Sequence, residues 1–386
     1  MPMEPPGGRP LRVAVDATPL LGHPTGVGAF CAGVLGGLAG RPDLAVSAFA
    51  VSWRRRRLVE TLVPAGVAVR QRAMPARPLH RSWARSEQPP LEWFVGPADV
   101  VHGTNFVVPP TRRAARVMTV HDLTTVRFPE LCDGPTLAYP HLIRRAMDRG
   151  AWVHTPSRFV ADEVVELLGA DPARVRAVHS GVPPLPPPDP GAAGRYLPAG
   201  TSRFVLAVGT AEPRKDLPGL VRAFDLLAAD RPDLALLLAG PEGWGVDPLA
   251  RAVERASARA RVVRTGWVDD ATLSGLLHSA EVLAYPSVYE GFGFPPLQAM
   301  AAGVPVVASR AGALPEVLGE AAELVPVDDP AALAASLAAV LDGPERRAEL
   351  VALGRDRAGR FTWTACADGL AALYRDARDA RGAGPG

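Results

Sequence analysis

The sequence predicts an α/β protein with two doubly wound, parallel-sheet domains that face a central cleft. Short apolar runs rich in β-branched residues alternate with helix-length segments along the whole chain. Many of these runs are continuous, as expected of parallel strands that are covered on both faces. A stretch rich in Pro and Gly, residues 182–200, divides this pattern into two similar halves.

The predicted strands of the first half are Arg12–Asp16, Ala45–Val51, Val67–Arg70, Asp99–His102, Val117–Val120, Trp152–Thr155 and Arg176–His179. Those of the second half are Phe204–Val208, Leu234–Ala239, Arg261–Arg264, Val282–Tyr285, Pro305–Ala308 and Glu323–Pro326. Segments of helix length lie between them, for example Leu217–Ala229 and Asp329–Leu341. Repeated β–helix–β order implies right-handed crossovers between parallel strands.

The predicted boundaries follow from this pattern. Residues 1–185 form a first domain, 186–200 a stiff linker and 201–360 a second domain, and 361–386 a C-terminal helix and tail that pack back on the first domain. The chain has 386 residues, enough for two domains with separate cores. Since ligands of such sheets bind beyond the carboxyl ends of the strands, facing domains would place a cleft between those ends.

Composition and charge exclude several classes of protein. The net charge of +2 provides no strong field for nucleic acid, and the three cysteines, Cys31, Cys132 and Cys366, lack metal-ligand spacing. The N-terminus lacks the apolar core of a signal peptide, and no apolar run is long enough to span a bilayer. We therefore expect a cytoplasmic protein. The basic run WRRRRLVE, residues 53–60, fits a solvated helix face and a contact with anionic lipid head groups about equally.

The first group of candidate site residues follows the strand Phe204–Val208. Gly209 and Thr210 come directly after it, and Arg214 and Lys215 precede a probable helix start. Two cations beside a helix N-terminus make an efficient diphosphate clamp, because Arg binds two oxygens at once and Lys adds a point charge. An isolated Arg-Lys pair is, however, more often a solvated turn.

The second group lies in SVYEGFGFPPLQAM, which also follows a strand and precedes a helix. Its glycines let the backbone amides of Gly291–Phe294 approach an anion. Glu290 repels phosphate and would instead accept hydrogen bonds from sugar hydroxyls, while Gln298 would bind a ribose. Together these groups describe a sugar-nucleotide site. The alternative, a turn whose glycines serve only packing, leaves Glu290, Phe292 and Phe294 without a purpose.

The first half has a weaker set of candidates. Gly26 and Gly28 form a loop after the first strand, where backbone could approach phosphates or an acceptor. They lack the full G-x-G-x-x-G fingerprint, which argues against a nicotinamide site. The sequence also lacks a Tyr-x-x-x-Lys pair, which argues against a dehydrogenase or epimerase on the same architecture.

The motifs resemble those of the retaining glycosyltransferases of the GT-B fold, family 4 (group 1). EGFGFPPLQAMAAGVPVVAS is similar to the family's EGFGxPxxEAMAxGxPVVAS, and GTAEPRKDLPGLVRAF matches its G-T-x-E-P-R-K-N-L element. PTGVGAF, HGTNFVVPP and VMTVHDLTTVRFPE resemble elements of its N-terminal domain, so the resemblance covers nearly the whole chain. Within the family, the HDL and EPRK forms look most like bacterial mannosyltransferases of surface-polysaccharide assembly.

The resemblance implies a role for each matching residue. The implied catalytic residues are His121, Glu290, Arg214 and Lys215. The implied donor-binding residues are Gly26, Gly28, Gly209, Thr210, Arg214, Lys215, Glu290, Gly291, Phe292, Gly293, Phe294 and Gln298, and the acceptor-side residues are His102, Asn105 and Asp122. Gln298 stands where the family usually has a second Glu that binds ribose, so the acceptor oxygen remains but the charge is lost.

The predicted function is retaining transfer of a hexose from a nucleotide diphosphate sugar to a hydroxyl of a glycan, glycolipid or small molecule. Mannose from GDP-mannose is favoured, and a UDP- or other nucleotide sugar is the alternative. No D-x-D pair occurs in the sequence, which fits a metal-independent enzyme without a bound cofactor. A nucleotide-sugar-binding protein without catalysis is a second alternative, because Gln298 replaces an acid. Peripheral contact with an anionic membrane stays one of the two readings of the basic run at residues 53–60, and a nucleic-acid partner is not expected.

Overall fold

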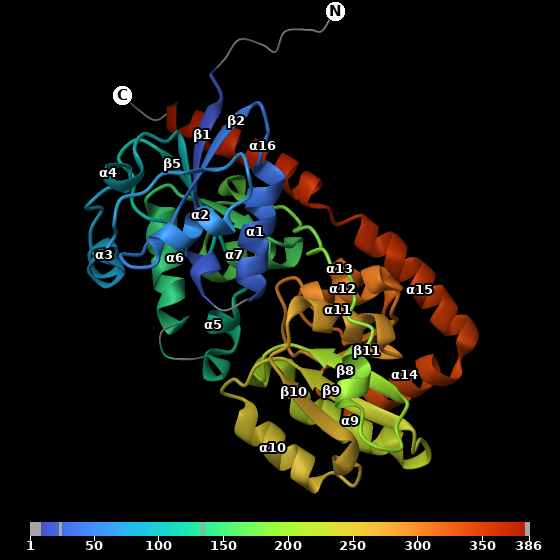
Figure 1. Ribbon diagram of the computed structural model, residues 1–386. Coiled ribbons are helices and arrows are strands. Elements are labelled where there is room, and N and C mark those ends of the chain that lie inside the picture. The colour runs from blue at the N-terminus through green and yellow to red at the C-terminus, as the bar shows by residue number, and fades with distance from the viewer. Residues whose placement is uncertain (1–8, 23–24, 133, 135, 383–386) are drawn as a thin grey trace, which may run out of the picture. The chain divides into compact units, whose positions relative to one another are not determined.

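The computed structural model describes residues 9–22, 25–132, 134 and 136–382 (Figure 1). The chain divides into two compact units. The first unit comprises Met1–Gly181 together with Thr362–Gly386, and the second comprises Val182–Phe361. Each unit has its own sheet.

The first unit contains a seven-stranded sheet of order β3-β2-β1-β4-β5-β6-β7, in which every neighbouring pair is parallel. Its strands are β1 (Leu11–Asp16), β2 (Leu44–Phe49), β3 (Ala68–Val69), β4 (Val100–Gly103), β5 (Ala115–Thr119), β6 (Trp152–Thr155) and β7 (Val175–Ala177). The direction of winding reverses between β1 and β4, so the topological switch point of this sheet lies where these two strands end.

Helices connect these strands and cover the sheet. They are α1 (Gly26–Leu38), α2 (Val59–Leu62), α3 (Ala76–Trp83), α4 (Glu92–Val95), α5 (Thr124–Arg127), α6 (Tyr139–Asp148), α7 (Arg158–Leu168) and the C-terminal α16 (Trp363–Gly382). Local capping explains where several of them begin: Ser157 accepts a hydrogen bond from the Val160 N–H at the start of α7. Gly169 then ends α7 in the left-handed conformation.

The second unit contains a six-stranded sheet of order β10-β9-β8-β11-β12-β13, again with parallel pairs. Its strands are β8 (Arg203–Val208), β9 (Leu234–Ala239), β10 (Val262–Gly266), β11 (Val282–Tyr285), β12 (Val306–Ser309) and β13 (Glu323–Val325). Its helices are α8 (Ala192–Tyr196), α9 (Leu217–Leu227), α10 (Val246–Arg255), α11 (Asp270–Ser279), α12 (Phe294–Ala302), α13 (Leu314–Leu318), α14 (Pro330–Asp342) and α15 (Pro344–Gly359). The switch point lies between β8 and β11.

The predicted fold class, two α/β domains with parallel sheets, is confirmed, and each predicted strand is present within a few residues of its expected bounds. Each strand is a short run between turn-forming residues; the central strands of both sheets are buried, whereas the edge strands β3 and β10 are half-buried or exposed. The side chains of β9, for example, are buried throughout.

The stretch 186–200 differs from the stiff linker that the sequence predicts. It contains α8 and belongs to the second unit, where it is fastened to α11. The Asp189 N–H donates to the carbonyl of Ala271 at 3.1 Å, and the Ser274 hydroxyl donates to the carbonyl of Pro186 at 2.7 Å. A Cβ at Gly275 would come within 2.2 Å of the Asp189 carbonyl oxygen, so the glycine permits this close approach.

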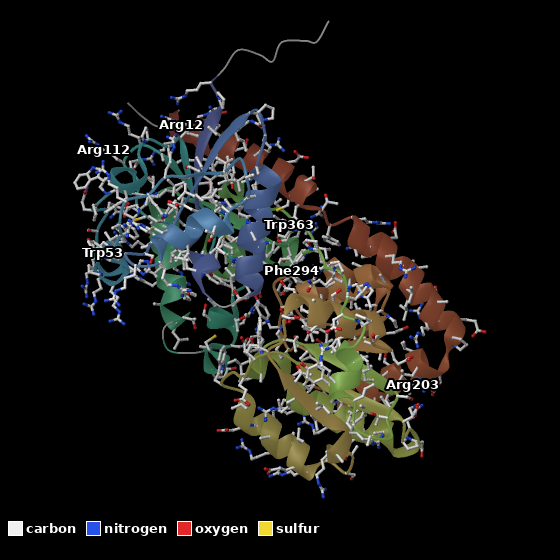
Figure 2. All side chains as sticks on the ribbon, in the orientation of Figure 1. Arg12, Trp53, Arg112, Arg203, Phe294 and Trp363 are labelled. Atoms are coloured by element: carbon white, nitrogen blue, oxygen red, sulfur yellow. The ribbon has the colours of Figure 1, made fainter. Side chains whose placement is uncertain are left out.

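The helix α16 packs in the first unit although it follows the second unit in sequence. Its first residue is Trp363, which Figure 2 labels. Trp363 lies against glycines of the first unit. A Cβ at Gly33 of α1 would come within 2.2 Å of the Trp363 ring, and a Cβ at Gly181 within 2.4 Å of its backbone nitrogen. The absence of side chains at these positions therefore lets the indole and the start of α16 sit directly on α1.

A buried chain of hydrogen bonds ties α16 to the sheet. Tyr374 Oη lies 2.7 Å from His102 Nδ1, His102 Nε2 lies 2.8 Å from Thr119 Oγ1, and Thr119 Oγ1 lies 3.0 Å from His154 Nδ1. His154 Nε2 lies 3.0 Å from the Val178 carbonyl oxygen. Because a carbonyl only accepts, His154 donates from Nε2, and every other bond in the chain then has one donor and one acceptor.

Both histidines in this chain are neutral. Burial lowers the pKa of His154 to about 4 and the pKa of His102 well below its ordinary value. A proton on His102 Nδ1 or His154 Nδ1 would replace an acceptor by a second donor and break the chain. The neutral, directional arrangement is thus a structural link from α16 through strands β4, β5 and β6 to Val178, the residue after β7.

Replacing Tyr374 by Phe should lower the free energy of unfolding by about 1–3 kcal/mol, because it leaves His102 Nδ1 buried without a donor. Chemical unfolding followed by circular dichroism measures this change. Tyr196→Phe is the matched control: Tyr196 is half-buried, and among the described residues no hydrogen bond to its hydroxyl is found. Equal stability of the Tyr374→Phe variant and the unchanged protein would contradict the proposed link.

Candidate functional site

The second unit brings Glu290, Arg214 and Lys215 into direct contact. Arg214 Nη1 lies 2.8 Å from Glu290 Oε2, and Lys215 Nζ lies 2.7 Å from Glu290 Oε1. Arg214 and Lys215 follow β8, and Glu290 follows β11. These strands are hydrogen-bonded neighbours at the switch point, so side chains beyond their carboxyl ends meet. The two groups of residues predicted separately from the sequence thus form one cluster.

Backbone hydrogen bonds hold the two loops of the cluster together. The Val288 N–H donates to the carbonyl of Arg214 at 2.8 Å, and Arg214 Nη1 donates to the carbonyl of Tyr289 at 2.9 Å. The Ala313 N–H donates to the carbonyl of Glu290 at 2.8 Å. A Cβ at Gly312 would come within 2.2 Å of that same carbonyl oxygen, so the loop needs a glycine here. The position of the Glu290 carboxylate is therefore fixed from several sides.

Tyr285, the last residue of β11, and Gly209 also contact Lys215. Lys215 Nζ donates to the Tyr285 hydroxyl at 2.6 Å, and Tyr285 is buried. The stem of Lys215 lies over Gly209, where an added Cβ would be 3.2 Å from Lys215 Cε. Gly209 has a φ of 151°, a value that side chains rarely allow. Gly209 therefore supports the position of Lys215, a role that the sequence did not indicate.

The electrostatics of the cluster favour an ionised Glu290. Burial of Glu290, which is 6% exposed, disfavours the charged form, but the attraction of Arg214 and then of Lys215 outweighs it and lowers the pKa of Glu290 to about 2. Burial lowers the pKa of Lys215, and the attraction of Glu290 opposes that effect only in part. Glu212 Oε2 lies 3.4 Å from Arg214 Nη2, so two carboxylates balance the two cations.

The glycine-rich turn ends at the N-terminus of α12. Gly293 takes the position before the helix with a φ of 104°, and Pro295 and Pro296 occupy the first turn. A Cβ at Gly293 would come within 2.9 Å of Leu314, so the turn is closely packed. The Phe292 ring packs edge-to-face on Phe294, with centroids 5.4 Å apart. Gly293 thus supplies one residue of left-handed conformation at the start of α12, a feature that anion nests include.

Gln298 lies one turn into α12 and is half-buried. In the described part of the chain, its amide has no side-chain hydrogen bond. Thr210 is also half-buried, on the loop after β8. A cavity of about 350 Å³ adjoins this loop at the carboxyl ends of β8, β9 and β10. Its lining residues, which the sequence did not single out, include Gly240, Glu242, Arg264 and Thr265.

In the first unit, His121 lies just beyond β5 and is half-buried between aromatic rings. Its Nε2 donates to the Thr104 carbonyl at 2.8 Å, and its ring packs edge-to-face on Phe30 at a centroid distance of 5.0 Å. Burial lowers the pKa of His121. The neutral ring therefore keeps Nδ1 as its acceptor atom.

Three predicted residues of the first unit are engaged in structural contacts. His102 is fully buried between Tyr374 and Thr119, so the prediction that it contacts the acceptor is wrong. Gly28 is buried, and its N–H donates to Thr25 Oγ1 at 3.1 Å, which commits the amide proposed for phosphate to capping α1. Asp122 Oδ1 accepts from the Thr124 N–H at 2.9 Å and from the Thr124 hydroxyl at 2.7 Å, just before α5.

Two predicted residues remain exposed or half-buried. Gly26 is exposed at the start of α1, and Asn105 lies half-buried in the loop after β4. The structure adds Asp16, at the carboxyl end of β1, which is buried with its Oδ1 accepting from the Thr18 N–H at 2.8 Å. Burial raises the pKa of Asp16 to about 6, although the bonds from Thr18 oppose this rise. The strand-end rule that selected His121 would have found Asp16 too.

Comparison with known proteins identifies the family. Residues 194–357 match the glycosyl transferases group 1, and residues 25–184 match Glycosyltransferase Family 4. O-antigen chain mannosyltransferase B of Escherichia coli is 32% identical over 273 residues, 69% of this chain and 71% of that protein. D-inositol 3-phosphate glycosyltransferase of Segniliparus rotundus is 31% identical over 312 residues, 77% of this chain and 68% of that protein.

The fold also matches solved structures. Sucrose-phosphate synthase from Thermosynechococcus elongatus has a TM-score of 0.72 at 21% identity, over 96% of this chain and 100% of that chain. The chain therefore belongs to the group 1 glycosyltransferases of family 4, with the GT-B fold that the sequence predicted. It is a transferase of the nucleotide-sugar type.

The ion cluster predicts a pH-dependent stability difference between the protein and its Glu290→Gln variant. At neutral pH the variant should be less stable by about 3 kcal/mol, because two buried cations lose their carboxylate. The folded pKa of Glu290, about 2, lies below its ordinary value of 4.5. The contribution is therefore complete above pH 4.5 and is lost as the pH falls toward about 2.

Urea unfolding of both proteins at neutral pH and at about pH 4 measures the difference, which should narrow at the lower pH. Glu254→Gln is the control, since Glu254 is exposed on α10 and no ion pair to it is found among the described residues. A difference that stays constant or widens on acidification would contradict the assigned pairing.

Proposed function

We propose that the protein transfers a hexose from a nucleotide diphosphate sugar to a hydroxyl of a glycan, glycolipid or small-molecule acceptor, with retention of anomeric configuration and without a metal ion or bound cofactor. The observation that carries this proposal is the contact of Arg214 and Lys215 with Glu290 at the switch point of the second sheet. Fixed cations beside a helix N-terminus are suited to a leaving group that gains negative charge.

The cluster supports the binding of a diphosphate by exchange of ionic partners. Arg214 and Lys215 are already oriented, but each is paired with the Glu290 carboxylate. Phosphate oxygens would take over these two cations, and the amides at the start of α12 would bind the distal phosphate. Glu290 would then turn its oxygens to donor-sugar hydroxyls, which donate hydrogen bonds to a carboxylate. Charge on the leaving group and recognition of the sugar are thus coupled through one side chain.

The remaining contacts with the donor are proposed from where the cavity, Gln298 and Thr210 lie in the second unit. The 350 Å³ cavity beside Gly209 would take the nucleobase, because it adjoins the loop that carries the diphosphate cations. Gln298 would accept and donate hydrogen bonds at the ribose, with Thr210 on the neighbouring loop. An amide in place of a carboxylate makes weaker hydrogen bonds to hydroxyls, so it would lower donor affinity without removing the contact.

The chemistry proposed is a front-face displacement. The bond from the anomeric carbon to the diphosphate breaks, with its electron pair leaving on the phosphate oxygen, while the acceptor oxygen bonds to the same face. The acceptor's proton passes to the departing phosphate. Glu290 is poorly suited to act as nucleophile or base, because its low pKa and its two ionic partners make it a weak one. His121, with Nδ1 as acceptor, would contact the transferred sugar. Gly26 stays a lesser candidate for donor binding, and Asn105 and Asp122 stay lesser candidates on the acceptor side.

Mannose from GDP-mannose is the proposed donor, because a relative 32% identical to this chain is an O-antigen chain mannosyltransferase. A UDP- or other nucleotide sugar is the alternative with the same chemistry. Thermal unfolding with GDP-, UDP- and ADP-sugars tests this choice, since a ligand at ~100 times its Kd adds about 2.7 kcal/mol of stability. GDP-mannose should give the largest rise in Tm. If no nucleotide sugar raises the Tm, the donor site is wrongly assigned.

Arg214→Ala and Lys215→Ala should each lower kcat/KM for sugar transfer by about 100-fold or more, because charge on the leaving group loses its stabilisation. The matched control is Arg222→Ala, which removes a half-exposed cation of α9 that lies 3.8 Å from Asp328, away from Glu290. Steady-state kinetics with the best donor from the thermal series measure the effect. Unchanged kcat/KM in both cluster variants would contradict the proposed role.

A cytoplasmic location with peripheral contact to an anionic membrane is also proposed. None of the described helices is long and apolar enough to cross a membrane. Trp53 is 59% exposed at the outer edge of the first unit (Figure 2), and Leu58 and Leu62 are 45% and 46% exposed beside it in sequence. The arginines at 54, 55 and 57 are exposed in the same segment. This combination of basic and apolar side chains supports contact with lipid head groups.

Sedimentation with vesicles tests the membrane contact. Binding to vesicles that contain phosphatidylglycerol should fall as salt is added, because exposed charges are screened. Arg54→Ser combined with Arg55→Ser should weaken it, and vesicles of phosphatidylcholine alone are the control. Absence of binding at low salt would refute this part of the proposal.

A further inference from the structure

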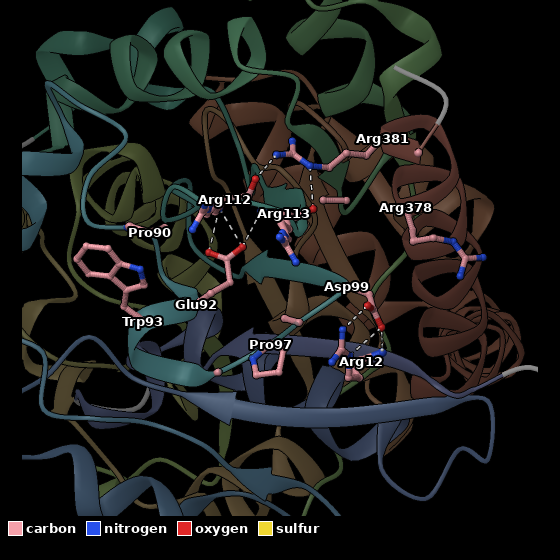
Figure 3. Close-up of a pocket in the computed structure, with 14 residues that line it drawn as sticks. Arg12, Pro90, Glu92, Trp93, Pro97, Asp99, Arg112, Arg113, Arg378 and Arg381 are labelled. Carbon is pink, nitrogen blue, oxygen red and sulfur yellow. Dashed lines mark hydrogen bonds and ion pairs between the residues drawn. The ribbon is translucent and has the colours of Figure 1, made fainter. Parts of the chain in front are cut away.

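The first unit has an arginine-rich cavity at the amino ends of its central strands. His121 lies beyond the opposite, carboxyl ends. A cavity of about 540 Å³ opens where β1, β4 and β5 begin (Figure 3). It is lined by α4, by the turn before β5 and by the last turn of α16, and its charged residues are Arg12, Glu92, Asp99, Arg112, Arg113, Arg378 and Arg381. We call it the arginine pocket. His121 follows the carboxyl end of β5, whereas the pocket adjoins the amino end, so the two sites are separated by the length of the strand.

The turn that carries Arg112 and Arg113 is fastened from two sides. Glu92 accepts hydrogen bonds from the N–H groups of Arg112 and Arg113, both at 2.9 Å, and from that of Ala114 at 3.1 Å. Arg381 donates to the carbonyls of Arg113 at 2.9 Å and Arg112 at 3.2 Å. Figure 3 shows these bonds converging on the turn from α4 and α16. The Glu92 carboxylate and the Arg381 guanidinium thus fix the backbone of Arg112 and Arg113.

The side chains that this turn presents are two cations for which the described residues supply no counter-ion. Arg112 and Arg113 are exposed, and neither forms an ion pair with any described residue. Of the two acids in the pocket, Asp99 is paired with Arg12 at 2.7 Å, and Glu92 is occupied by backbone N–H groups. Those N–H groups outweigh the effect of burial and lower the pKa of Glu92. Neither acid is therefore available to balance Arg112 and Arg113.

The surroundings add positive potential. Arg116, the second residue of β5, is buried, and its pKa is lowered by burial and then, against the attraction of Glu87, by the charges of Arg381 and Arg149. The contribution of Arg381 and Arg149 to this lowering shows that positive charges gather beside the pocket. At the rim of the pocket, Trp93 is 60% exposed and offers an apolar, planar face.

We propose that the arginine pocket binds a phosphate group carried by a ligand other than the sugar donor. Arg112 and Arg113 would hold the phosphate oxygens in bidentate fashion, and Trp93 would contact the remainder of the ligand. A metal cation is excluded as occupant by the sign of the charge. The phosphate belongs either to a soluble phosphate ester or to a phospholipid head group, and both present the same chemistry to the two guanidinium groups.

The test uses glycerol 3-phosphate as the soluble probe and phosphatidylglycerol vesicles as the lipid probe. Arg112→Ser combined with Arg113→Ser should weaken binding of the recognised probe by about tenfold or more, since each lost bond to a charged group costs at least this factor. Arg251→Ser combined with Arg255→Ser removes the same charge from exposed positions of α10, in the second unit, and serves as the matched control. Calorimetry measures the soluble probe, and sedimentation measures the vesicles.

Trp93 supplies a local readout. The fluorescence change on binding should be present in the unchanged protein and absent in Trp93→Phe, whereas a general charge effect would not depend on this residue. Loss of binding of both probes in the Arg112/Arg113 variant supports the proposal with phosphate alone as the recognised group. Loss of vesicle binding alone supports it with the lipid as the source. Equal binding by this variant and the unchanged protein, or binding of neither probe, overturns it.

Discussion

The carboxylate of Glu290, held between Arg214 and Lys215, is the interaction on which the rest of the second unit depends. Burying three charged groups is costly, and only their mutual contact makes it tolerable. The contact exists because β8 and β11 are adjacent, so that loops distant in sequence leave the same point of the sheet. Tyr285, Gly209 and Gly312 then fix the two loops around it. The architecture therefore explains why a local cluster of charge can be kept in place.

In the first unit, a buried chain of neutral polar groups holds α16 to the sheet. Its polar core runs from Tyr374 through His102, Thr119 and His154 and carries no charge, because burial holds both histidines in the neutral form. This link fastens a helix that the chain reaches only after completing the second unit. His121, near the same rings, is oriented by the Thr104 carbonyl, and no bond from its Nδ1 to another described residue is found. Structural and candidate catalytic histidines are thus distinguished by their hydrogen-bond partners.

Much of the fold could be predicted from sequence, because each strand is a local apolar run and parallel order follows from the alternation of strands and helices. Glu290, Arg214 and Lys215 could also be selected as candidate site residues from local sequence, since each lies in a loop after a predicted strand. Their mutual pairing could not be predicted, because it depends on β8 and β11 being neighbours. His102 was misassigned for a similar reason: its partner Tyr374 lies 272 residues away. Residues 186–200 were misjudged because Pro and Gly content does not reveal contacts with α11.

The central claim is that donor binding exchanges the partners of Arg214 and Lys215. A crystal structure of the protein with an intact nucleotide diphosphate sugar tests it most directly. The account predicts phosphate oxygens within hydrogen-bond distance of Arg214 and Lys215, and a Glu290 oxygen bonded to a hydroxyl of the sugar. A nucleotide sugar bound with its diphosphate elsewhere, while Glu290 keeps both ion pairs and does not contact the sugar, would contradict it.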